Sequence, residues 1–212
     1  MEGVDLDYFD LHSLIDMVSG PNRNPLIDSY VSNAELVARA PGSRIKHQAW
    51  VGGYLDHVVH AANYALLLDK INSDIVGNDE SGFSDIVLVM LLHDFGKIVK
   101  YNKIGLGWDY IDSPNNVEHD FLRKTIEENE FQLNSIHQNA LEFIHGEGES
   151  YNLDKRLMSP LAVLCHQADI WSARYCPNNP LPEGNPWNGA YRHVSKDNLI
   201  GYIKELNVLR FE

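Results

Sequence analysis

Cysteine is scarce in this sequence, which contains only Cys165 and Cys176 among its 212 residues. The two do not form a Cys-x-x-Cys pair, so the sequence predicts neither a disulfide framework nor a zinc site built from cysteines. An apolar run of about 20 residues, which a bilayer-spanning helix requires, is also missing. Residues 1–8 lack the apolar core of a signal peptide. We therefore expect a cytoplasmic protein without a membrane partner.

Basic side chains are outnumbered by acidic ones, with 17 Lys and Arg against 30 Asp and Glu, and the formal net charge is −13. An acidic surface repels phosphate backbones, which makes long nucleic acid a poor partner. A small anionic ligand is not excluded in the same way, because bound divalent cations can reverse the sign of the charge at a site. The hydrophobic fraction of 44% is ordinary for a globular protein, and a homo-oligomer is compatible with the sequence.

Apolar residues recur mostly at helical spacing, and neither a repeat nor a low-complexity segment is visible. The spacing predicts helices over residues 8–18, 26–40, 50–71, 116–128, 133–144, 159–175 and 196–206. Clusters of Pro, Gly, Asn and other polar residues predict loops over residues 21–25, 72–82 and 176–188. The sequence therefore favours an all-α fold.

Residues 86–92 are apolar on every face, which is typical of either a buried strand or a buried helix. We favour a helix, because Met and Leu recur and the run continues into His93 and Asp94 before Gly96, which would fit a helix C-terminal cap. Residues 98–112 differ, since Val, Ile and aromatic side chains flank Gly105 and Gly107. That pattern predicts a small β-hairpin after the helix.

The strongest chemical signal is the pair His93-Asp94 at the end of the most apolar predicted helix. Burying a carboxylate there is costly unless a positive group pairs with it. A capped, hydrogen-bonded pair would satisfy this dipeptide, and so would a divalent metal held by imidazole and carboxylate. His57 and Asp169 lie on or near the apolar faces of two other predicted helices. Three helices that each present a ligand-type residue favour the metal site.

The order His57 … His93-Asp94 … Asp169 resembles the HD-domain metal-dependent phosphohydrolases, and Gly96-Lys97 after His-Asp is also typical of them. Residues 47–57 and the Ala-Asp-x-x-Ser-Ala-Arg ending at 168–174 resemble the HD domain of YhaM-type exoribonucleases most closely. The resemblance implies an HD-type helical bundle that spans residues 1–212 as one domain. Its motif core would cover about 44–176, with N-terminal helices at 1–43 and a C-terminal loop and helix at 177–212.

The resemblance also implies the ligands. His57, His93, Asp94 and Asp169 would hold one divalent ion, and His119 with His145 would hold a second, with Asp94 bridging the two. This chain departs from the pattern at Ile144, where the subgroup often has a further histidine. Mixed His and Asp ligation suits one or two ions of Mn, Fe, Co, Ni, Zn or Mg.

Several residues are candidates for catalysis or substrate binding. The resemblance gives Asp94 and Asp169 catalytic roles as ligands, and Lys97 could bind a substrate phosphate or be a surface lysine favoured by the helix dipole. His47 could contact substrate, and Arg174 occupies a place where the subgroup has a basic residue. Four aromatic side chains could stack a nucleobase: Trp108, Tyr110, Trp171 and Tyr175. Aromatic residues at such spacing are more often part of the core.

The function implied by the resemblance is hydrolysis of a phosphoester or phosphoanhydride by metal-activated water. A short, acidic chain favours a small nucleotide substrate, such as a nucleoside mono- or triphosphate with ribose or deoxyribose. A 3′–5′ exonuclease or cyclic-nucleotide phosphodiesterase is the alternative, because the motif spelling is that of exoribonucleases. A non-catalytic nucleotide-binding module is a third reading, against which the intact ligand set argues.

Overall fold

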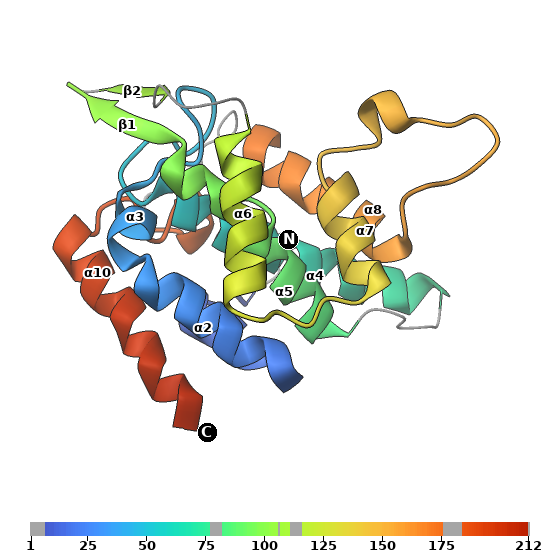
Figure 1. Ribbon diagram of the computed structural model, residues 1–212, viewed down its shortest axis with the longest axis horizontal. Helices are drawn as coiled ribbons and strands as arrows, with labels where there is room; N and C mark the ends of the chain where they lie inside the picture. Colours follow the sequence, from blue (N-terminus) through green and yellow to red (C-terminus); the bar gives the residue numbers. More distant parts are fainter. Residues whose placement is uncertain (1–6, 77–81, 106, 111–115, 176–183, 212) are drawn as a thin grey trace, which may run out of the picture.

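The computed structural model describes residues 7–76, 82–105, 107–110, 116–175 and 184–211. Helices make up most of the described chain, and its strands form one antiparallel two-stranded hairpin (Figure 1). The predicted all-α bundle with a small β-hairpin is thus confirmed. Among the described residues, no helix has both the length and the apolar character needed to cross a bilayer.

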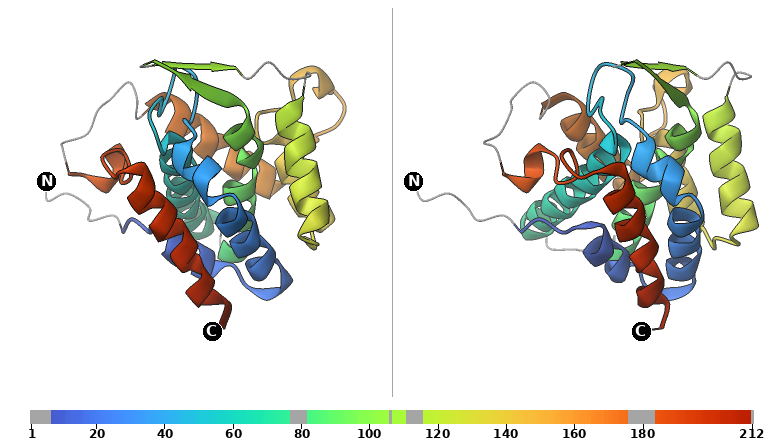
Figure 2. Two further views of the ribbon diagram at one scale, coloured as in Figure 1. Left: turned by 60° about the vertical axis from the view of Figure 1, so that its left-hand side comes forward. Right: turned by 90° about the vertical axis from the view of Figure 1, so that its left-hand side faces the viewer.

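Three helices form the centre of the molecule: α4 (Gly53–Val76), α5 (Phe83–Leu92) and α8 (Pro160–Ile170). They pack on one another, with α4 in contact with both of the others (Figures 1 and 2). Every residue from Ile86 to Leu92 is buried, which explains why the sequence is apolar on all faces there and confirms the helix interpretation. The loop expected from residue 72 begins later, because α4 continues to Val76, and residues 77–81 lie outside the described chain.

The N-terminal part consists of α1 (Leu11–Met17), a 3₁₀ turn η1 (Gly20–Asn22), α2 (Arg23–Ser32) and α3 (Ala34–Arg39). The prediction of one helix over 26–40 is wrong, because the chain breaks at Asn33, whose side chain donates to the Ser29 carbonyl. The prediction of a loop at residues 21–25 is also wrong in part, because these residues belong to η1 and to the first turn of α2. Proline is tolerated in the first turn of a helix.

The C-terminal helix α10 (Lys196–Lys204) and the 3₁₀ segment η6 (Glu205–Phe211) return to this N-terminal part. Helix α10 packs on α3, and η6 packs on α2, as Figure 2 shows. Segments from the two ends of the sequence therefore cover one side of the central helices together. The predicted helix over 196–206 is confirmed as α10, and its last residues continue as 3₁₀ helix.

After α5 the chain forms the 3₁₀ segment η2 (Phe95–Val99), then β1 (Tyr101–Ile104) and β2 (Gly107–Tyr110), in which Tyr101 pairs with Tyr110. Helix α6 (Val117–Glu128) packs on η2. Gly96 is not the C-terminal cap that we expected, because α5 ends at Leu92. A Cβ atom at Gly96 would lie 2.0 Å from the Glu118 carbonyl oxygen, so this glycine allows η2 and α6 to touch.

Helix α7 (Ser135–Phe143) and the 3₁₀ turn η3 (Gly148–Ser150) lead to α8, which is followed by a π-helical turn, η4 (Trp171–Tyr175). The expected helix over 159–175 is therefore α-helical only to Ile170. Of the loop expected at 176–188, residues 176–183 lie outside the described chain, and the rest includes the 3₁₀ turn η5 (Pro186–Asn188).

Candidate metal centre

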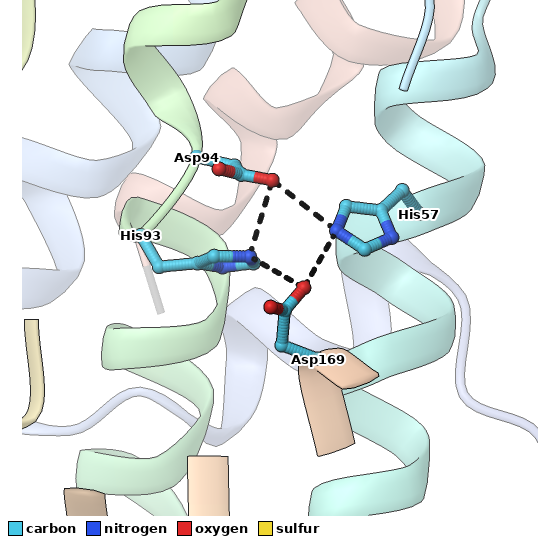
Figure 3. A group of neighbouring side chains, drawn as sticks. All are labelled: His57, His93, Asp94 and Asp169. Carbon is cyan, nitrogen blue, oxygen red and sulfur yellow. Dashed lines mark ion pairs between the residues drawn. The ribbon is translucent and has the colours of Figure 1, made fainter. Parts of the chain in front are cut away.

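Four buried side chains from the three central helices point toward a common centre (Figure 3). His57 comes from α4, His93 and Asp94 follow the last residue of α5, and Asp169 comes from α8. The Nε2 atom of His57 lies 3.2 Å from both Asp94 Oδ2 and Asp169 Oδ1. The Nε2 atom of His93 lies 3.3 and 3.7 Å from the same two oxygens. All four ligand atoms lie within 4.8 Å of one another, the spacing expected around one ion with bonds of about 2.0–2.2 Å.

The two imidazoles direct their Nε2 atoms at this centre. His57 Nε2 and His93 Nε2 are both buried and face the two carboxylates, yet neither makes a hydrogen bond of normal geometry within the described chain. The other ring nitrogen of His93 donates to the Met90 carbonyl oxygen, 2.7 Å away, so Nε2 is the nitrogen that His93 could offer to a metal ion. A buried nitrogen without a partner costs free energy, and a bound metal ion would remove that cost. The donor set thus fits a divalent ion.

Ser172 fixes the ring of His57 in the same way. Its hydroxyl donates to the His57 carbonyl at 3.3 Å, so the Oγ atom is left to accept from His57 Nδ1 at 3.1 Å. The same Oγ lies 3.1 Å from His60 Nδ1. In the sequence, Ser172 was noted only as part of the family resemblance. Its position three residues after Asp169 could have indicated its role, because residues three apart lie on the same side of a helix.

Charges inside the centre compensate one another. Burial raises the pKa of Asp94, but Lys97 and His93 outweigh burial and hold that pKa well below its usual range. Burial likewise disfavours ionisation of Asp169, yet its contacts with His145, His57 and His93 lower its pKa. For His93, burial lowers the pKa, and the neighbouring carboxylates overcome this and raise it to about 10. The centre therefore keeps two carboxylates ionised by surrounding them with positive groups, the role that a cation can take over.

His145 faces the outer oxygens of the two carboxylates. Its Nδ1 atom lies 3.2 Å from Asp169 Oδ2, and its Nε2 atom lies 3.6 Å from Asp94 Oδ1. These are not the oxygens that face His57 and His93. His119 on α6 is exposed and borders the same cavity as Asp94 and His145. The structure thus brings His145 to Asp94 and places His119 in the wall of the same cavity, although neither histidine belongs to the compact four-ligand cluster.

A second cavity opens over Asp169 and contains three of the four predicted substrate-binding residues. It is lined by His47, Lys97 and Arg174, together with Lys46, His145 and His166. The Lys97 ammonium forms an ion pair with Asp94 Oδ2 and is mostly buried, so it is not a free surface lysine. We call this space the entrance cavity. Trp108 is not among its lining residues, because that side chain is buried in β2.

Two aromatic residues that we considered for base stacking are already stacked on each other. Trp171 is stacked with Tyr64 and with Tyr175, with ring centroids 4.1 and 4.9 Å apart and nearly parallel planes. The Trp171 indole is therefore already engaged by two rings of the chain itself. We therefore favour packing with neighbouring rings, and not base stacking, as the role of Trp171 and Tyr175. A further candidate, Tyr110 on the hairpin, has the Arg44 guanidinium over its ring.

Comparisons with known proteins add no further constraint. No protein-family model matches the chain, and neither a curated protein nor a solved structure matches it significantly. The buried cluster of two histidines and two aspartates is compatible with an HD-type metal site. The family resemblance stays a prediction that rests on the sequence motifs and on this geometry.

Proposed function

We propose that this chain is a metal-dependent phosphohydrolase of the HD-domain kind that cleaves a phosphoester or phosphoanhydride bond of a small nucleotide. The observation that carries the proposal is the pair of buried Nε2 atoms of His57 and His93, which face two carboxylates without a hydrogen bond of normal geometry. His57, His93, Asp94 and Asp169 would hold the ion. When bound, a divalent ion supplies activation of a water nucleophile and Lewis-acid stabilisation of the phosphoryl oxygens.

The remaining groups suit a phosphate substrate. Lys97, Lys46 and Arg174 bring positive charge to the entrance cavity of a protein whose net charge is −13. Such a local reversal of sign attracts a small anion while the rest of the surface repels a long polyanion. Lys97 would donate hydrogen bonds to phosphoryl oxygens as charge develops on them. His145 would supply a second ion-binding position together with His119, on the outer oxygen of Asp94.

An activity screen tests the proposal. The full chain would be stripped with a chelator, reloaded with Mn²⁺, and offered nucleoside mono- and triphosphates, their deoxy forms, 3′,5′-cyclic nucleotides and a short oligonucleotide. We expect hydrolysis of at least one mono- or triphosphate, and loss of that activity in Asp94→Asn. Shortening of the oligonucleotide alone would favour the exonuclease instead. Bound metal without turnover of any compound would leave a nucleotide-binding module as the better description.

A further inference from the structure

A separate pocket lies beside the metal centre, on the other side of His47. Its walls are the segment Lys46–Trp50 and the segment Trp187–Arg192, and its floor is formed by Asp56 and His60 of α4. We call it the Trp pocket after Trp50 and Trp187, two indoles that sequence analysis did not single out. Lys46 and His47 border both this pocket and the entrance cavity, so the two spaces adjoin.

Asp56 builds the pocket by tying both walls to α4. Its carboxylate is buried, and it accepts hydrogen bonds from the Trp50 indole Nε1 and from the Tyr191 backbone N–H, each at 2.8 Å. The first wall is also fixed internally, because Ser43 Oγ accepts from the backbone N–H groups of Lys46 and His47. A space whose two walls are hydrogen-bonded to one buried carboxylate is preformed, as small-molecule sites usually are.

The chemistry of the Trp pocket is aromatic and cationic. The Arg192 guanidinium lies over the Trp50 ring, 4.5 Å from its centroid, and the Trp187 ring meets the ring of His60 edge-on at 5.3 Å. Within the described chain, no aromatic ring lies parallel to either indole. Neither Lys46 nor Arg192 forms an ion pair within the same part of the chain, although the charge of Arg192 also acts on Asp56, where it lowers the pKa of the carboxyl against the effect of burial. Two partly exposed indoles beside two cations suit a planar aromatic ring that carries phosphate.

The position of the pocket fits one molecule that also reaches the metal centre. His60 on the pocket floor follows the candidate ligand His57 by three residues of α4, which is roughly 4.5 Å along the helix axis. The imidazoles of His57 and His60 share the hydroxyl of Ser172. His47, which borders both spaces, has its ring 4.7 Å from that of His57.

We infer that the Trp pocket binds the base of the nucleotide whose phosphate is hydrolysed at the metal centre, with stacking on Trp187 as the main source of affinity. This inference rests on the proposed function. It assigns specificity for nucleotides over other phosphate esters to residues 46–50 and 187–192, away from the ligand cluster. Arg192 and Lys46 lie at the border of the pocket and contact the ribose-phosphate side of the ligand.

The test compares substrates with and without a base. For the Mn²⁺-loaded full chain, kcat/KM is measured for the best nucleoside monophosphate and for ribose 5-phosphate, and their ratio gives the preference for the base. We expect Trp187→Ala to lower this ratio at least about tenfold, as the loss of one stacking contact implies. Trp187→Phe should restore most of it. Tyr151→Ala, which removes an exposed aromatic ring that lines neither the Trp pocket nor the entrance cavity, should leave the ratio unchanged.

An unchanged ratio in Trp187→Ala, with the variant folded by circular dichroism, would overturn the inference. A second measurement separates it from the proposed function. Adenosine, guanosine, cytidine and uridine carry no phosphate, and their binding to the chain is followed by quenching of tryptophan fluorescence. Quenching that is lost in Trp187→Ala supports the Trp pocket even if no phosphate ester is hydrolysed. Absence of binding by all four nucleosides, in a chain that hydrolyses nucleotides without preference over ribose 5-phosphate, contradicts it.

Discussion

Ser172 Oγ lies 3.1 Å from His57 Nδ1, and the Ser172 hydroxyl donates its proton to the carbonyl oxygen of His57 itself. One serine from the turn after α8 therefore contacts both the ring and the backbone of a histidine on α4. Because the hydroxyl proton is engaged, Oγ can only accept from the imidazole, and His57 Nε2 is directed at Asp94 and Asp169. Ser172 acts as a positioning residue for the candidate ligand.

Replacing Ser172 with Ala is expected to weaken Mn²⁺ binding by about 10- to 100-fold, the usual effect of losing a group that orients a ligating histidine. Isothermal titration of the metal-free chain measures the dissociation constant. Ser29→Ala is the matched control, because Ser29 is equally buried and donates to the Pro25 carbonyl far from the centre. Equal metal affinities in Ser172→Ala, Ser29→Ala and the unchanged chain would remove Ser172 from the account.

The Lys97 ammonium pairs with the Asp94 oxygen that also faces His57 and His93. A divalent ion would have to bind against this charge. Lys97→Met should therefore raise Mn²⁺ affinity about tenfold, the equivalent of about 1.4 kcal/mol. Nucleotide turnover should fall about 100-fold, because a donor to the phosphoryl group is lost.

The two readouts of Lys97→Met move in opposite directions, which a purely structural lysine would not produce. Lys124→Met serves as the control, because it removes the same charge from an exposed position on α6. A variant at Lys97 that binds metal less tightly and turns over nucleotide normally would refute the assignment of this residue to the substrate phosphate.

His145 is expected to determine how many ions the chain holds. Because its ring faces the outer oxygens of Asp94 and Asp169, His145→Ala should reduce bound Mn²⁺ from two ions to one per chain and leave the tighter site intact. Equilibrium dialysis with elemental analysis gives the count. His166→Ala is a suitable control, since His166 lines the same entrance cavity and its Nδ1 pairs with the Ile144 carbonyl. One ion per chain in the unchanged protein, in His145→Ala and in His166→Ala would mean that the second site does not exist.

Gly96 couples the His-Asp segment to α6. A methyl group at this position would overlap the Glu118 backbone, so Gly96→Ala should lower the free energy of unfolding by about 3 kcal/mol. Urea denaturation measures the loss. Gly201→Ala in α10 adds the same methyl group where no atom lies within 4 Å, and it should be neutral or stabilising by up to about 1 kcal/mol. Similar stabilities of the two variants would mean that η2 and α6 do not touch as described.

Much of the fold could be predicted because its periodicity is strong. The central helices bury wide apolar faces, and the hairpin is marked by Gly105 and Gly107. The break at Asn33 was missed, since the apolar residues of α2 and α3 together follow one helical spacing, whereas the structure ends α2 at Ser32 and begins α3 at Ala34. The role of Gly96 was also missed, because its contact is with a residue 22 positions later.

The four candidate ligands were identifiable because each combines a ligating side chain with an apolar neighbourhood. Groups that act through long-range contacts gave no such signal. Asp56 was not singled out from the sequence, yet it accepts hydrogen bonds from the Trp50 indole and from the Tyr191 backbone N–H, 135 residues away. Trp187 lies in a Pro- and Asn-rich stretch that predicts only a loop. Sequence patterns along one helix reveal a ligand, whereas a pocket formed by distant loops needs the structure.

The central claim is that His57, His93, Asp94 and Asp169 bind one divalent ion together. The most direct test is anomalous X-ray diffraction from crystals of the chain soaked in Mn²⁺. The account predicts a strong peak about 2.0–2.3 Å from His57 Nε2, His93 Nε2, Asp94 Oδ2 and Asp169 Oδ1. No peak at this position, or peaks only at exposed carboxylates, would contradict it.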